Sequence, residues 1–182
     1  SQVLWGPSDV AAWVLTLSEE PTAATVAGVG ISQPGEGGVI TVWGPAGAPG
    51  RTTIAITVAA VLAKAQRPVV LVDADVFAPS VTTLLGLSGQ SSGLLGVCRM
   101  ARANTLNVDN VMDKAETYQA KGSSFPVLTG LAGGHKAHTI EVLSWEKVLD
   151  VLVEAGFLVV VDVSSGLSPQ PGEVVGGPSV NG

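Results

Sequence analysis

The chain has 182 residues, of which 46% are hydrophobic and 13% are charged, and its formal net charge is −6. This length and composition suffice for one sizeable hydrophobic core. The acidic balance excludes a nonspecific grip on nucleic acid by the whole surface, and no apolar run is long enough to span a bilayer. The single cysteine, Cys98, permits no internal disulfide, which favours a reducing, cytoplasmic compartment.

Composition divides the chain into three regions. Residues 1–37 read as a lead-in that ends in a Gly-rich and Pro-containing linker. Residues 38–167 carry the alternating apolar segments of a domain. Residues 164–182 are rich in Gly, Pro and Ser, and we expect a flexible tail over residues 168–182.

The middle region alternates short β-branched runs with helical segments. We expect strands at residues 39–43, 69–72, 125–129 and 158–161. We expect helices at residues 52–66, 80–87, 94–103, 108–121 and 140–154. The first helix is apolar almost all round and is predicted to be deeply buried, whereas the last is amphipathic with Leu143 facing inward. Strands that alternate with helices predict an α/β fold with a mostly parallel sheet.

The most informative stretch is residues 43–53, which read Trp-Gly-Pro-Ala-Gly-Ala-Pro-Gly-Arg-Thr-Thr. It follows the first expected strand and opens the first expected helix. A strand, a glycine-rich turn, a basic residue and two threonines form the layout of a phosphate-binding loop. Backbone N–H groups of such a turn and the positive end of the helix converge on one point, where an anion is held.

Aspartates follow two of the other strands. Asp73 and Asp75 come directly after the second strand, and Asp162 follows the last. Ligands of parallel sheets bind at the carboxyl ends of the strands, so these side chains are expected near the phosphate loop. A phosphate loop with a nearby carboxylate is what binding of a magnesium nucleotide requires. Each aspartate alone is equally consistent with a turn or a helix cap.

These motifs resemble the MinD/ParA group of deviant Walker ATPases, and within it the CpaE-like branch of actinobacterial septum-site-determining and pilus-assembly proteins. Residues 68–87 are similar to the second motif of the family, residues 125–131 to its Leu-x-x-Gly strand, and residues 157–163 to its Walker B strand. The resemblance implies a three-layer P-loop NTPase fold over residues 38–167. It also implies truncation at the C-terminus, because the family continues with further strands, and a lead-in that ends a degenerate receiver domain.

The resemblance assigns roles to individual residues. Backbone N–H groups would bind the phosphates at Gly47, Ala48, Gly50, Arg51, Thr52 and Thr53. The Thr52 hydroxyl would bind Mg²⁺, and Asp162 would hold the same ion through water. Asp75 would orient the attacking water with support from Asp73, and Arg51 would stand in for the catalytic lysine.

A biological role follows from the same resemblance. It implies an ATP- or ADP-binding protein that acts in cell-division site selection, pilus localisation or chromosome partitioning. Such a protein would work as a homodimer, with a division, pilus or partition protein as its partner. It would be cytoplasmic, and a full-length form would be peripheral at the membrane, although nothing in this stretch of sequence indicates membrane binding.

The loop departs from the family pattern at four positions. Ala46 stands where the family has its signature lysine, and Arg51 replaces the Walker lysine. Ala48 replaces a glycine, and Pro49 has no N–H to donate to a phosphate. Loss of one well-placed donor or charge can lower a rate by a factor on the order of 10²–10³. We therefore expect impaired ATPase activity, and a non-catalytic scaffold that keeps the NTPase fold is the alternative. A P-loop kinase or other phosphotransferase is a third, weaker option.

Overall fold

The computed structural model describes residues 36–45, 49–89, 91–120, 122–131 and 142–163. Most of the predicted lead-in and the whole predicted tail lie outside these residues, and so do Gly47 and Ala48 of the phosphate loop. The domain boundaries inferred from composition therefore stay predictions.

The described residues form a five-stranded sheet in the order β1-β5-β2-β4-β3. All neighbouring pairs are parallel except β3 and β4, which are antiparallel. Its strands are β1 (Gly38–Val42), β2 (Val69–Ala74), β3 (Glu116–Ala120), β4 (Ser123–Leu128) and β5 (Leu158–Val163). The expected α/β fold with a mostly parallel sheet is confirmed.

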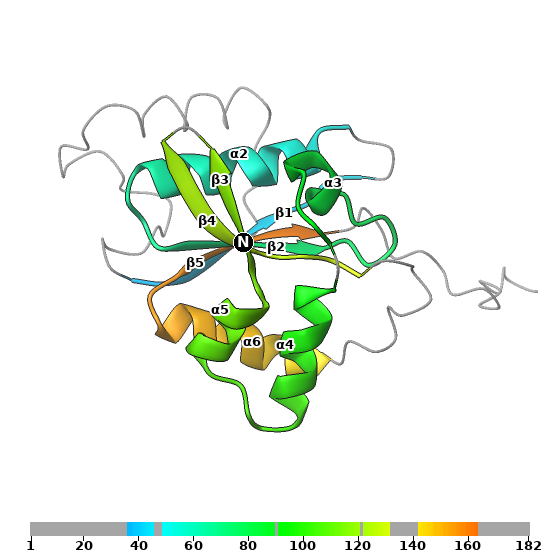
Figure 1. Cartoon of the computed structure of the whole chain (residues 1–182), viewed down its shortest axis with the longest axis vertical. Coiled ribbons are helices and arrows are strands. Elements are labelled where there is room, and N and C mark those ends of the chain that lie inside the picture. Colours follow the sequence, from blue (N-terminus) through cyan, green and yellow to red (C-terminus); the bar gives the residue numbers. More distant parts are fainter. Residues whose placement is uncertain (1–35, 46–48, 90, 121, 132–141, 164–182) are drawn as a thin grey trace, which may run out of the picture.

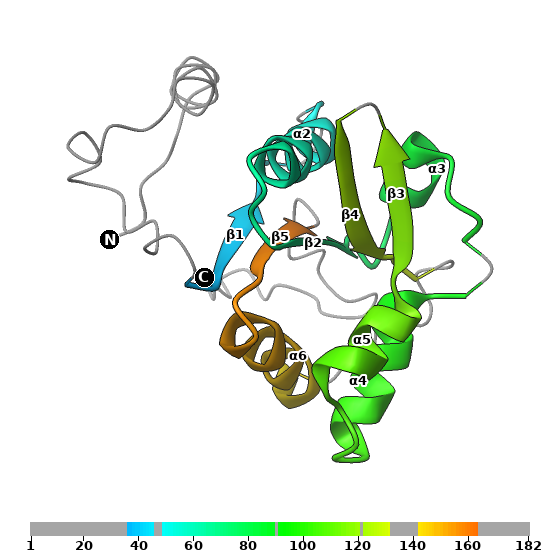
Figure 2. The same cartoon turned by 60° about the vertical axis from the view of Figure 1, so that its left-hand side comes forward.

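Helices cover both faces of this sheet and produce three layers (Figures 1 and 2). The long helix α2 lies over one face, with the short α3 near it, and α4, α5 and α6 lie over the other. The described helices are α2 (Arg51–Lys64), α3 (Val81–Leu85), α4 (Gly93–Arg102), α5 (Val108–Lys114) and α6 (Val142–Glu154). None of them is long and apolar enough to cross a membrane.

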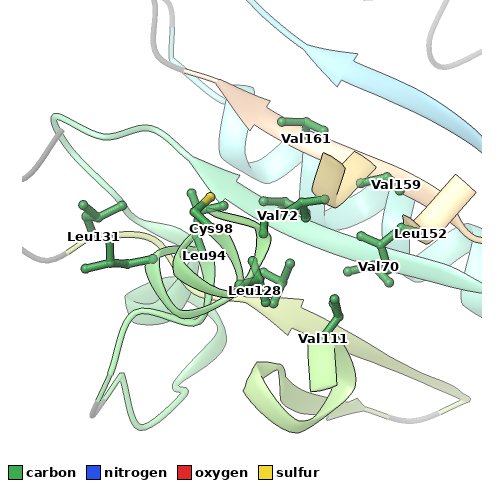
Figure 3. Packing of buried hydrophobic residues seen from close by; sticks show 14 residues of the cluster. Val70, Val72, Leu94, Cys98, Val111, Leu128, Leu131, Leu152, Val159 and Val161 are labelled. Carbon is green, nitrogen blue, oxygen red and sulfur yellow. The ribbon is translucent and has the colours of Figure 1, made fainter. Parts of the chain in front are cut away.

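The two faces of the sheet build two hydrophobic cores, because alternate side chains of each strand point to opposite sides. Val70 and Val72 of β2 pack towards α4, α5 and α6, together with Val159 and Val161 of β5 (Figure 3). The intervening residues of both strands pack under α2. Strands β2 and β5 are buried on both faces, which explains why each reads as a continuous apolar run.

One predicted helix is wrong in its second half. The expected helix over residues 108–121 ends at Lys114, and the chain then forms the edge strand β3. Tyr118 of β3 pairs with Phe125 of β4, and their ring centroids are 5.3 Å apart. This cross-strand aromatic contact stabilises a strand in a segment whose local composition also permits a helix.

Two expectations about helix burial are also corrected. Helix α2 buries only one face, and Ile54 is 38% exposed, because the sheet covers the helix from one side only. Leu143 of α6 is 71% exposed rather than inward-facing. Ser144 is buried instead, since it lies four and eight residues before the buried Val148 and Leu152 and so shares their face of the helix.

Candidate functional site

The carboxyl ends of three adjacent strands meet at one edge of the sheet. Strand β5 lies between β1 and β2, and its Asp162 is in register with Val42 on one side and with Asp73 on the other. The turn after β1 leads to α2, and the turn after β2 leads to α3. The sheet thus brings the glycine-rich turn and both strand-end aspartates to one place, as the spacing predicts.

The described part of the phosphate loop ends in a glycine conformation. Gly50 precedes α2 with φ 92° and ψ −2°, in the left-handed region that favours glycine. Because glycine has no side chain, no side chain at this N-cap position accepts a hydrogen bond from the first N–H groups of α2. The first turn of an α-helix carries unsatisfied N–H groups and a positive partial charge, so an anion is favoured in front of Arg51 and Thr52.

The Arg51 side chain does not extend away from the loop. Its Nη1 donates to the carbonyl oxygen of Gly44 at 2.9 Å and to that of Pro45 at 3.1 Å. The guanidinium therefore ties the end of β1 to the start of α2. Its charge still reaches the strand ends, because it lowers the pKa of Asp162.

Asp162 is a buried carboxylate with an unsatisfied oxygen. The residue is 2% exposed, and Oδ2 has no hydrogen-bond partner among the described residues. Burial raises the pKa of Asp162, and the charge of Asp75 raises it further, while the hydroxyl of Thr52 and the charge of Arg51 lower it. A buried polar atom without a partner is costly, so a cation or water at Oδ2 would stabilise this site.

Asp73 is fully buried and holds the following turn. Its Oδ2 accepts from the Val81 N–H at 3.1 Å, and its Oδ1 accepts from the Asp75 N–H at 3.3 Å. Burial raises the pKa of Asp73 to about 7, and the charges of Asp162 and Asp75 add to that shift against the two hydrogen bonds. Burial thus raises the pKa of both Asp73 and Asp162, and the charge of Asp75 adds to both shifts.

The Asp75 side chain stabilises the turn that follows β2. Its Oδ1 accepts from the N–H groups of Phe77 and Ala78 at 3.1 and 2.9 Å. This is the local arrangement that Asp commonly makes in turns. The charge of Asp75 nevertheless raises the pKa of both Asp73 and Asp162, which places it beside the pair. Its role in orienting water stays a prediction.

The two threonines of the loop differ in their surroundings. Thr52 is half-buried, and its Oγ1 lies 2.9 Å from the Oγ of Ser80. Thr53 is exposed, and its carbonyl oxygen accepts from the Thr57 hydroxyl within α2. The Thr52 hydroxyl also lowers the pKa of Asp162, which places it beside that strand-end carboxyl. The metal role expected for Thr52 stays a prediction.

The donor set fits a hard cation that shares a phosphate ligand. The described residues contain no group of three or more His, Cys, Asp or Glu side chains that could hold a metal ion alone. Mg²⁺ usually takes one or two protein oxygens, phosphate oxygens and several waters. The Thr52 hydroxyl and the orphaned Oδ2 of Asp162 are oxygen donors of this kind.

Comparison with known families gives one decisive match. Residues 37–134, which are more than half of the chain, match the ParA family model, described as NUBPL iron-transfer P-loop NTPase. The chain belongs to the ParA family. A comparison with curated proteins gave no match.

Three solved structures resemble this one. The septum site-determining protein MinD of Pyrococcus horikoshii, complexed with Mg-ADP, has a TM-score of 0.54 and 19% identity over 72% of this chain and 50% of its own. The Pyrococcus furiosus cell division ATPase MinD has a TM-score of 0.52 and 21% identity, over 73% of this chain and 52% of its own. The kinase domain of Escherichia coli tyrosine kinase ETK has a TM-score of 0.54 and 20% identity, over 73% of this chain and 48% of its own. These likenesses establish the fold, and the chain spans about half the length of each.

Sequence reasoning missed three residues of this ParA-family site. Ser80 contacts Thr52 across 28 positions of sequence. Thr129 is buried at the end of β4, where its hydroxyl accepts from the Gly93 N–H at the start of α4 and donates to the Ser91 carbonyl. Gly130 packs so closely on the turn after β2 that a Cβ there would meet Asp73 Cγ at 2.9 Å. For Thr129 and Gly130 the available signal was a polar or glycine residue just after a strand, and for Ser80 it was a serine at the start of a helix.

Proposed function

We propose that this ParA-family chain binds ATP or ADP together with Mg²⁺ at the carboxyl edge of its sheet, and that it hydrolyses ATP weakly or not at all. The observation that carries the proposal is the convergence at one place of the Gly50 turn, the Thr52 hydroxyl and the unsatisfied Oδ2 of Asp162. A nucleotide phosphate would meet the open N–H groups of α2, and a magnesium ion would meet the two oxygens.

In this proposal backbone N–H groups bind the phosphates and side-chain oxygens bind Mg²⁺. The N–H groups of Gly50, Arg51, Thr52 and Thr53 stand at the positive end of α2, where they can donate to phosphate oxygens. Thr52 and Asp162 would hold Mg²⁺, which neutralises phosphate charge when bound. We extend the phosphate role to Gly47 and Ala48 from the family resemblance alone, because both lie outside the described residues.

Weak hydrolysis is supported by the state of the loop. Arg51 hydrogen-bonds two loop carbonyls, so its guanidinium is already engaged before any phosphate arrives. An arginine fork also differs in shape from the compact ammonium of a lysine. The carboxylate of Asp75 must leave or share its bonds to the Phe77 and Ala78 N–H groups before it can orient a water.

We further propose that the protein acts, like the CpaE-like branch of this group, in division-site selection, pilus localisation or chromosome partitioning. A nucleotide-bound homodimer and a division, pilus or partition protein would be its partners. Peripheral attachment to the membrane would belong to a longer form. Similarity of the fold to two MinD proteins, one a septum site-determining protein and one a cell division ATPase, supports division-site selection among these roles.

Iron transfer, which the family description mentions, is not part of the proposal. Thiolates are the usual protein ligands of iron–sulfur clusters. The one cysteine of the 182 residues, Cys98, lies on the buried face of α4, and burial raises its pKa to about 11. It therefore stays a neutral thiol at physiological pH.

A binding experiment tests the proposal. A fluorescent ATP analogue is titrated with the chain in Mg²⁺ and in EDTA, and unlabelled ATP is used as competitor. Thr52→Val should weaken binding in Mg²⁺ by about tenfold or more, because it removes a hydroxyl next to a charged ligand. Thr57→Val, on the exposed side of the same helix, is the matched control and should bind normally. Absence of competitive binding by the wild type would remove the nucleotide claim.

The second candidate is a scaffold that keeps the fold and has lost nucleotide use. The specific observation in its favour is the pair of Arg51 hydrogen bonds, which satisfies the loop internally. The same titration separates the two candidates, since a scaffold gives no competitive signal in either buffer. The resemblance of the fold to a kinase domain keeps phosphotransfer as a third option, which an acceptor-dependent ATP turnover would reveal.

A further inference from the structure

Ser80 lies at the start of α3 but does not cap that helix. It occupies the N-cap position with φ −129° and ψ −13°, and its side chain makes no capping hydrogen bond. Serine at this position usually accepts from an N–H of the first helical turn. Its Oγ lies instead 2.9 Å from the Oγ1 of Thr52 at the start of α2.

A second residue takes over part of the capping function. The N–H of Val81, the first residue of α3, donates to Oδ2 of the buried Asp73 at 3.1 Å. The hydroxyl of Ser80 is therefore available to the neighbouring helix. Its direction towards Thr52 joins the first turns of two helices that are 28 residues apart in sequence.

We propose that Ser80 is a positioning residue for Mg²⁺ at this site, a proposal that rests on the proposed nucleotide function. A threonine hydroxyl that binds a cation uses an oxygen lone pair and keeps its proton to donate. Ser80 Oγ is an acceptor within hydrogen-bond distance of Thr52 Oγ1. The other acceptor beside Thr52 is the Asp162 carboxylate, whose pKa the Thr52 hydroxyl lowers, and that carboxylate is the one expected to bind the cation. Acceptance by Ser80 directs the proton of Thr52 away from the cation and leaves the lone pairs of Thr52 directed towards it.

This hydrogen bond also links metal binding to α3. Without a cation either hydroxyl can be the donor, whereas a cation on Thr52 leaves Thr52 as the donor and Ser80 as the acceptor. Only one of the two donor directions between these hydroxyls then remains, and α3 becomes tied more firmly to α2. Binding of a magnesium nucleotide should therefore slow amide hydrogen exchange in α3, where the Leu84 N–H bonds the Ser80 carbonyl at 3.0 Å.

The test uses the whole chain with a fluorescent ATP analogue, titrated in Mg²⁺ and in EDTA. Ser80→Ala should weaken binding about fivefold in Mg²⁺, the effect of one ordinary hydrogen bond, and should leave binding in EDTA unchanged. Ser80→Thr keeps the hydroxyl and should bind within about twofold of the wild type. In a Thr52→Val background, Ser80→Ala should add nothing further, because the two hydroxyls act as a pair.

Amide exchange gives a readout that does not depend on affinity. At saturating magnesium nucleotide, exchange in α3 should slow in the wild type and in Ser80→Thr but not in Ser80→Ala. Equal weakening of Ser80→Ala in Mg²⁺ and EDTA would assign Ser80 a structural role and overturn the proposal, as would unchanged binding in both. Failure of the wild type itself to bind would instead remove the nucleotide function, so the two failures are distinguishable.

Discussion

Replacement of Asp73 by Asn should change how the stability of the protein depends on pH. Asp73 is fully buried, and its pKa rises from 3.8 to about 7 because of burial first, with the charges of Asp162 and Asp75 adding to it. The folded protein therefore binds this proton more tightly than the unfolded chain does. The contribution of Asp73 to the free energy of unfolding is therefore largest below pH about 4, and it decreases as the pH rises towards 7.

The magnitude follows from the size of the shift. A change from 3.8 to about 7 is about three pKa units, and each unit corresponds to about 1.36 kcal/mol, so the loss approaches about 4 kcal/mol between pH 4 and pH 7. Asn has almost the same shape, keeps an acceptor for the Val81 N–H and does not titrate. Its NH2 group cannot accept from the Asp75 N–H, but that loss is the same at every pH. Relative to wild type, Asp73→Asn should gain stability steadily over this range.

Urea unfolding followed by circular dichroism at pH 4, 5, 6, 7 and 8 measures this difference, in EDTA and without nucleotide. Asp113→Asn removes one exposed carboxylate from α5 and serves as the control for the change in net charge. A stability difference between Asp73→Asn and wild type that stays constant across the range would refute the reasoning. It would mean that Asp73 has the same affinity for its proton in the folded and unfolded states.

Two further predictions concern the loop and the packing around the site. Arg51→Lys combined with Ala46→Lys should raise the ATPase rate at least about tenfold, since it restores two compact charges near the phosphates; an unchanged rate in a phosphate-release assay would assign the limitation to Pro49 or to a partner. Gly130→Ala should lower the free energy of unfolding by about 1–3 kcal/mol, because the new Cβ would lie 2.7 Å from the Cβ of Pro79. Gly96→Ala is its control within α4, where a Cβ meets only a flexible side chain at 3.4 Å, and a gain of about 0.5–1 kcal/mol is expected from urea unfolding.

The sheet was predictable from sequence where burial on both faces leaves a continuous apolar run. Strands β2 and β5 have this property, and the Asp at the end of each marks the carboxyl edge without any structural information. Strand β3 was not predictable in the same way. Its stabilisation comes from pairing with β4, including the contact of Tyr118 with Phe125, and the residues 115–120 carry no local signal strong enough to exclude a helix.

The candidate site shows the same division. Spacing alone places Thr52, Asp73 and Asp162 together, since parallel strands end at one edge. It does not give the direction of a side chain. The return of Arg51 to the carbonyls of its own loop and the contact of Ser80 with Thr52 depend on rotamers and on packing between helices that are distant in sequence.

A crystal structure of the chain grown with Mg-ADP would show directly whether the carboxyl edge of the sheet binds a magnesium nucleotide. We expect phosphates at the N-terminus of α2, in contact with the N–H groups from Gly50 to Thr53, and Mg²⁺ between the Thr52 hydroxyl and Asp162. A cavity of about 680 Å³, which includes Arg67 in its lining, lies at the opposite edge of the sheet. Nucleotide in that cavity, or crystals without nucleotide at millimolar Mg-ADP, would contradict the account.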